Sequence, residues 1–315
     1  MSSPVNLEAG LADGRQPSET KVISASNARN YDRYMATHIS TLPNSRLRTL
    51  VIPREHGAWG MLLVPLATGA IVAALRSSVN SAGLTLFVIA ALSLFWLRTP
   101  VEAWLGTSAI KAQSGRERAL VLQAMVAISL LAAGSVAALL WDGRNRGLLI
   151  IGGVAALAFA VQAGVKKLGR KGRMPAQMIG AIGLTSTAAG AYYVATGNLD
   201  RVAIALWLAN WLFAGDQIHF VQLRIHASRA ATLGEKLRQG RQFLVGQIGL
   251  IVVIVAAFFY RLFPAWTAIA FAPVLLRGAF WFVRGRQSLD VHKLGFTELA
   301  HALAFGALLC VAFRM

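Results

Sequence analysis

Residues 243–260 read FLVGQIGLIVVIVAAFFY, an almost unbroken apolar run without a charged side chain. A helix of this length crosses most of a hydrocarbon layer about 30 Å thick. Similar runs recur along the chain and predict an all-α, polytopic transmembrane helical bundle with about nine spans. The nine predicted spans are residues 57–75, 81–97, 119–141, 147–165, 175–196, 201–222, 243–260, 265–283 and 295–313.

The composition agrees with a membrane protein and excludes several other classes. Hydrophobic residues make up 56% of the chain and charged residues only 14%, so a single soluble core is excluded. Cys310 is the single cysteine, which excludes a disulfide framework and a thiolate metal cluster. Phosphate-binding loops, metalloprotease motifs and nucleophile elbows are missing from the sequence, so hydrolases and nucleotide-driven pumps are not expected.

The basic residues predict the orientation of the bundle. Residues 1–45 are polar and predict a disordered cytoplasmic tail, which leaves 46–315 as the transmembrane helical domain. Most of the 31 Lys and Arg lie in the tail and in loops 98–118, 166–174, 223–242 and 284–294. The opposite side carries Arg76, Arg144, Arg146, Arg201, Arg261 and Arg314. By the positive-inside rule, the N-terminus is cytoplasmic and the C-terminus is outside, so the net charge of +18 sets orientation and does not indicate nucleic-acid binding.

A first polar cluster enters the first span at Glu55 and His56. A plain helix start explains part of it, because Pro53 suits a first turn, Glu55 suits the helix dipole and Trp59 suits the membrane interface. It does not explain why an acid and an imidazole are adjacent at the bilayer entry. Glu55 and His56 are therefore candidate site residues.

Two single charges lie near the same side of the membrane. Glu102, after the second span, either pairs with Arg98 or faces a cavity. Arg277, inside the eighth span, either extends to the interface or points inward and holds an anionic group. Both are candidate ligand-binding residues.

The segment from Asn210 to His226 carries the densest set of polar residues in a predicted span. At 100° per residue, Asn210, Gln217 and Arg224 form one stripe, because they recur every seven residues. A second stripe on another face includes His219 and His226. Such a helix end must be buried or line a wet cavity, either as a ligand site or as polar contacts between helices.

Glu298 and His301 fall inside the last span at i and i+3, on one face. A carboxylate that orients an imidazole is expected, either as a proton-transfer pair or as a structural hydrogen bond. A metal site is not expected, because the second Glu-x-x-His and the bridging acids of bundle metal sites are missing.

The motif PREHGAWGMLLVP at 53–65, the segment 210–229 and Glu298-Leu-Ala-His301 together resemble the YwiC-like family of bacterial membrane proteins. This resemblance implies a multi-pass protein of the bacterial cytoplasmic (inner) membrane. The predicted architecture is also similar to the UbiA-type intramembrane prenyltransferases, which bind magnesium and a prenyl diphosphate with paired Asp residues. Here the two corresponding segments offer only Glu102 and Asp216, so the chemistry of that family is not implied.

Three functions are compatible with these residues. In the first, a cytoplasm-facing cavity binds or modifies an amphipathic lipid or a quinone- or isoprenoid-type ligand, whose head is held by His56, Asn210, Gln217, Arg224 and Arg277 while Glu298 and His301 handle protons. The second is a small-solute transporter, and the third is a non-enzymatic membrane assembly factor. The crowding of polar residues on one side favours the first, because a transporter places polar groups near the midplane and on both sides.

Overall fold

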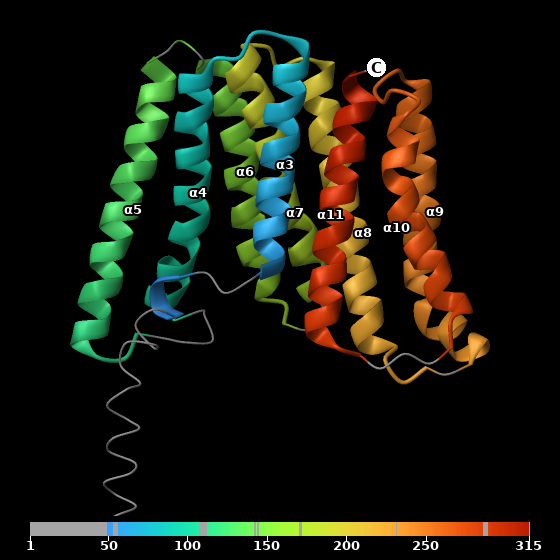
Figure 1. The fold of residues 1–315 in the computed structure, drawn as a ribbon. Coiled ribbons are helices and arrows are strands. Elements are labelled where there is room, and N and C mark those ends of the chain that lie inside the picture. The colour runs from blue at the N-terminus through green and yellow to red at the C-terminus, as the bar shows by residue number, and fades with distance from the viewer. Residues whose placement is uncertain are drawn as a thin grey trace, which may run out of the picture. The chain divides into compact units, whose positions relative to one another are not determined.

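The computed structural model describes residues 49–52, 56–106, 112–141, 143, 145–169, 172–230, 232–285 and 289–314. The predicted tail of residues 1–45 lies outside this part of the chain. Nine long helices run alongside one another, with their ends at two levels (Figure 1), and the described residues contain no strand. The helices are α3 (His56–Arg76), α4 (Ser81–Trp104), α5 (Gly115–Trp141), α6 (Asn145–Lys166), α7 (Arg173–Thr196), α8 (Arg201–His226), α9 (Leu233–Phe259), α10 (Thr267–Val283) and α11 (Val291–Arg314).

Each of these helices overlaps one predicted span, but some are longer than expected. The prediction of a polar loop over 223–242 is wrong for its second half, because α9 already begins at Leu233. Thr232 caps that helix through the backbone N–H of Glu235, and the Glu235 side chain accepts from the backbone of Thr232 in return. This capping box starts a charged amphipathic turn that apolar runs alone do not reveal.

Length and composition support a helical membrane bundle. Among the described helices, α3, α4, α5, α6, α7, α9 and α11 are long and apolar enough to cross a membrane. The apolar α10 has only 17 residues, and α8 carries polar and charged side chains along its second half. These two helices are therefore supported as parts of the bundle by their packing and not by hydropathy.

Small residues let α7 pack closely at the centre of the bundle. Its residues from Thr185 to Ala195 are buried, and α3, α4, α6 and α8 all pack against it. A Cβ on Gly69 of α3 would lie 2.1 Å from the Ala188 carbonyl oxygen, so only glycine permits this approach. Where lipid surrounds the helices, such close backbone contact is a main source of helix association.

The outer helices present apolar side chains outward. Leu130 on α5, Leu157 on α6 and Val245 on α9 are each more than half exposed. Exposed apolar faces of this extent suit contact with lipid acyl chains. The helices α8, α10 and α11 differ, because they direct charged side chains toward one another.

Candidate functional site

Three ionisable side chains meet inside the bundle, and we call them the charge cluster: Asp216 of α8, Arg277 of α10 and Glu298 of α11. Nη2 of Arg277 lies 2.6 Å from Oδ2 of Asp216, and its Nη1 donates to Oε2 of Glu298. The three side chains are only 2%, 8% and 7% exposed, respectively. One guanidinium therefore joins two carboxylates in an apolar environment, where an unpaired charge would be strongly unfavourable.

Neighbouring groups fix the orientation of the charge cluster. The Gln247 side chain of α9 donates to Oδ1 of Asp216, so a fourth helix takes part. Gln217 donates to the backbone carbonyl of Glu298 over 3.0 Å, and the Arg277 guanidinium lies 4.1 Å from the centre of the Phe220 ring. These contacts tie α8, α9, α10 and α11 together through polar groups.

Two atoms of the charge cluster have no hydrogen-bond partner among the described residues. They are Nε of Arg277 and Oε1 of Glu298, and both are buried. A cluster that exists only to join helices would be expected to satisfy every donor and acceptor. The unpaired atoms mark this region as a site with spare hydrogen-bonding capacity.

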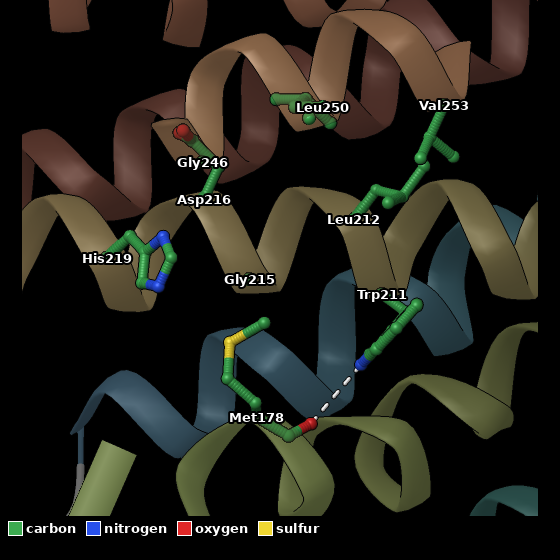
Figure 2. A pocket seen from close by; sticks show the side chains of 10 residues that line it. Met178, Trp211, Leu212, Gly215, Asp216, His219, Gly246, Leu250 and Val253 are labelled. Carbon is green, nitrogen blue, oxygen red and sulfur yellow. Dashed lines mark hydrogen bonds between the residues drawn. The ribbon is translucent and has the colours of Figure 1, made fainter. Parts of the chain in front are cut away.

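A groove borders the charge cluster at Asp216. It has a volume of about 120 Å³ and lies over α8 between α7 and α9 (Figure 2). The residues that line it are Met178, Trp211, Leu212, Gly215, Asp216, His219, Gly246, Gly249, Leu250 and Val253. Most of this lining is apolar, which is typical of small-molecule sites with a few orienting polar groups.

The polar groups of the groove lie toward one end. Figure 2 shows His219 and Asp216 toward one end of the groove and Leu212 and Val253 toward the other. The His219 ring packs against Gly246. A Cβ added to Gly246 would lie only 2.7 Å from Nδ1 of His219. His219 is seven residues from the end of α8, or about 10 Å along the helix axis. The groove therefore changes from polar to apolar with increasing distance from the helix end.

The predicted stripe of Asn210, Gln217 and Arg224 does not line this groove. Asn210 is buried and donates from Nδ2 to the Thr68 hydroxyl over 3.1 Å and to the Leu206 carbonyl over 2.8 Å. It thus joins α8 to α3, as polar contacts between helices would. Gln217 supports Glu298, and Arg224 is half-buried nearer the helix end. Of the predicted ligand-binding residues, His219 is the one that lines the groove.

The expected pairing of Glu298 with His301 is wrong in its geometry. The Glu298 carboxylate is directed to Arg277, and Nδ1 of His301 lies 2.6 Å from the Thr297 carbonyl oxygen. The Glu298 carboxylate pairs with the positive charge of the buried Arg277 on a neighbouring helix, whereas the His301 ring contacts the backbone of its own helix. The same contact resolves the alternatives for Arg277, which points inward and holds anionic groups of the chain itself.

The remaining predicted site residues lie elsewhere or outside the described part. Glu102 pairs with Arg98 over 3.0 Å and with Lys166 over 3.3 Å, which joins α4 to α6 away from the groove. Glu55 falls outside the described residues. His56 begins α3, but its side chain also lies outside the description.

Two important residues were missing from the predicted site: Asp216 and Gln247. Asp216 had a signal, because it is an ionisable residue well inside a predicted span and such residues are rare. Gln247 gives a weaker indication, because it is a polar residue within the long apolar run 243–260. Among the described residues, no group of three or more His, Cys, Asp or Glu could hold a metal ion.

Comparison with known proteins identifies one family. Residues 52–193 match the family model of the YwiC-like proteins, so this part of the chain is a YwiC-like region. No curated protein and no solved structure matches the chain. The matched region includes α3 to α6 and almost all of α7, whereas the charge cluster and most of the groove lie beyond it.

Proposed function

We propose that this chain is a multi-pass protein of the bacterial inner membrane that binds an amphipathic ligand in the groove between α7, α8 and α9. In this proposal all nine helices span the membrane, the N-terminus is cytoplasmic and the C-terminus is outside. The end at which α8 ends and α9 begins faces the cytoplasm, because its loops carry most of the basic residues.

The polarity gradient along the groove is the observation that carries this proposal. An amphipathic ligand entering from the cytoplasmic leaflet would place its head near His219 and Asp216 and its chain along Leu212, Leu250 and Val253. The imidazole of His219 makes no hydrogen bond to another described residue, so it is available to a ligand head. A lipid leaflet also changes from polar at its surface to apolar inside. The head and chain of a bound ligand would therefore lie at the same depths as those of the surrounding lipids.

The groove is also placed for access from the bilayer. Val245, Ile248 and Val252 of α9 are each about 60% exposed and face outward on the helix that forms one wall. A lipid-like molecule could therefore enter sideways without first crossing water. Isoprenoid and quinone-type molecules have this combination of a long apolar chain and a compact polar head.

Binding is favoured over prenyl transfer and over transport. A magnesium diphosphate needs several oxygen ligands, and the groove lining supplies one carboxylate, Asp216. A transport pathway would need polar groups toward both membrane faces, but the groove is apolar from Leu212 to Val253. A binding role, with or without a reaction, needs neither feature.

Gly249 offers a direct test, because it lines the groove and a Cβ there would meet open space. Gly249→Leu should fill the groove without moving the helices. The matched control is Gly134→Leu on α5, another exposed helical glycine with nothing within 4 Å of an added Cβ.

Mass spectrometry of molecules retained by the purified proteins supplies the measurement. We expect wild type and Gly134→Leu to retain the same lipophilic compound and Gly249→Leu to lose it. Equal retention by all three proteins, or no specific compound in any of them, would refute binding in this groove.

The orientation is tested separately by cysteine labelling. In a Cys310→Ser background, Ser78→Cys lies in the turn between α3 and α4, and Ser114→Cys precedes α5 at the opposite end. A membrane-impermeant maleimide added from the periplasmic side should label Ser78→Cys and leave Ser114→Cys unlabelled. The reverse pattern would overturn the proposed orientation.

A further inference from the structure

The electrostatics of the groove indicate which kind of head group it accepts, provided that the groove binds a ligand as proposed above. Among the ten lining residues, Asp216 is the one with a fixed charge, and that charge is negative. Arg277 contacts the same carboxylate but is not part of the lining. We propose that the groove selects an amphiphile with a cationic head, such as a protonated amine or a quaternary ammonium.

The Asp216 carboxylate is held in place and retains hydrogen-bonding capacity. Gln247 donates to Oδ1 and Arg277 donates to Oδ2, so both oxygens are oriented by α9 and α10. An ionised carboxylate has about four acceptor positions, of which these contacts use two. A cation in the groove can approach the remaining positions without breaking either bond.

The other polar groups of the lining do not favour an anion. The Nε1–H of Trp211 donates to the Met178 carbonyl over 3.2 Å, so this donor is already used. Neutral His219 offers one ring nitrogen as an acceptor and the other as a single N–H donor. An anionic head would therefore meet the Asp216 charge with few donors to offset it, whereas a cationic head would meet acceptors.

The charges behind the lining also favour a cationic head over an anionic one. Two carboxylates share one guanidinium in the charge cluster, which leaves a formal charge of −1 when both acids are ionised. Arg224 also interacts electrostatically with Glu298, but it does not line the groove. In an apolar region this negative field acts over a longer distance than in water.

Three probes with one bromine-terminated undecyl chain separate the contribution of charge from that of the apolar chain. They carry a trimethylammonium, a hydroxyl or a carboxylate head. Bromine quenches tryptophan fluorescence at short range, and Trp211 lies toward the apolar end of the groove, where the chain would end (Figure 2). The protein is used in nanodiscs of zwitterionic lipid, and Trp211→Phe in identical nanodiscs gives the background from the other tryptophans and from partition into lipid.

We expect the ammonium probe to quench Trp211 with an apparent affinity about tenfold higher than the alcohol, as a partly screened ion pair would give, and the carboxylate to bind least. Asp216→Asn should reduce the ammonium to the level of the alcohol and leave the alcohol unchanged. Arg277 remains paired with Glu298 in this variant, so the fold should persist. Glu102→Gln, an equal charge change outside the groove, should retain the preference.

The outcomes distinguish this inference from the proposed function. Equal binding of the ammonium and the alcohol by wild type, or a preference that survives in Asp216→Asn, overturns the cationic head while leaving the groove as a ligand site. Probes that fail to quench Trp211 in wild type, or that quench equally in Gly249→Leu, overturn the groove itself. Loss of the ammonium preference in Asp216→Asn alone supports the inference.

Discussion

The helices α3 to α7 and the helices α8 to α11 are held together by different interactions. In the first group, glycine and alanine allow backbones to touch, as at Gly69 and Ala188. In the second group, the charged side chains of α8, α10 and α11 meet at Arg277, and the Gln247 amide of α9 donates to Asp216. The first arrangement depends on shape and the second on charge balance, so the two regions should respond to substitution in different ways.

The two groups of helices also differ in how they relate to the family match. The YwiC-like region covers residues 52–193, which is the closely packed group of helices. The charge cluster and the polar end of the groove lie in the second group. The first group therefore acts as a scaffold in our interpretation, and the second carries the ligand chemistry.

Removing the central cation should give the largest effect. Arg277→Met would leave two buried carboxylates without their shared partner, which costs about 3–5 kcal/mol for comparable buried pairs. We expect a lower melting temperature in detergent and less folded protein in the membrane. The measurement is thermal unfolding monitored by tryptophan fluorescence.

A triple variant shows whether charge balance is the cause. Asp216→Asn, Arg277→Met and Glu298→Gln together remove all three charges, so most of the lost stability should return. Should Arg277→Met melt like wild type, the charge cluster would not be holding α8, α10 and α11 together.

The closely packed helices α3 to α7 should be sensitive to side-chain size and not to charge. Gly69→Val places a Cβ against the Ala188 backbone, which cannot move without shifting α7. Overpacking of this kind costs about 1–3 kcal/mol. The control is Gly134→Val, where an added Cβ meets nothing within 4 Å. Equal melting temperatures for the two variants would contradict a close backbone contact between α3 and α7.

How far the sequence predicts these two regions depends on whether a feature is local. The predicted apolar runs overlap each of the nine long helices in the described part of the chain, because a helical run consists of consecutive residues. The start of α9 was missed, because Lys236 and the charged residues around it obscure the helix in an apolar scan. Lys236 is in fact buried, and its Nζ donates to the Trp281 carbonyl over 3.0 Å near the end of α10.

The charge cluster could be predicted only in part. Asp216, Arg277 and Glu298 are each visible as charges in apolar helices, but their meeting depends on which helices are neighbours and on their relative height. Glu298 and His301 are close in sequence, and this local spacing suggested the wrong partner. The sequence does not predict the groove, because it forms only where Gly246 and Gly249 of α9 lie opposite α8.

A polar contact between the two regions should give an intermediate effect. Asn210→Leu removes the bond from α8 to Thr68 of α3. The Thr68 hydroxyl would keep its own bond to the Pro65 carbonyl at 2.8 Å, so no buried donor is left unpaired. Hydrogen bonds between membrane helices contribute about 0.6 kcal/mol on average, so we expect a small decrease in melting temperature and normal probe binding. Loss of probe binding at full stability would return Asn210 to the ligand site and extend that site toward α3.

The smallest effect is expected for Glu102→Gln, although this residue also contacts two basic side chains. Arg98 and Lys166 are partly exposed, with Lys166 at 46%, so water and salt screen both pairs. Such pairs contribute about 0–1 kcal/mol, and the glutamine amide oxygen can still accept a hydrogen bond from either base. We therefore expect wild-type melting at moderate salt and a detectable decrease only at low salt, measured over a series of salt concentrations. A large loss that did not depend on salt would show that this contact behaves like the buried charge cluster, and the division of the molecule into a region held by shape and a region held by charge would then fail.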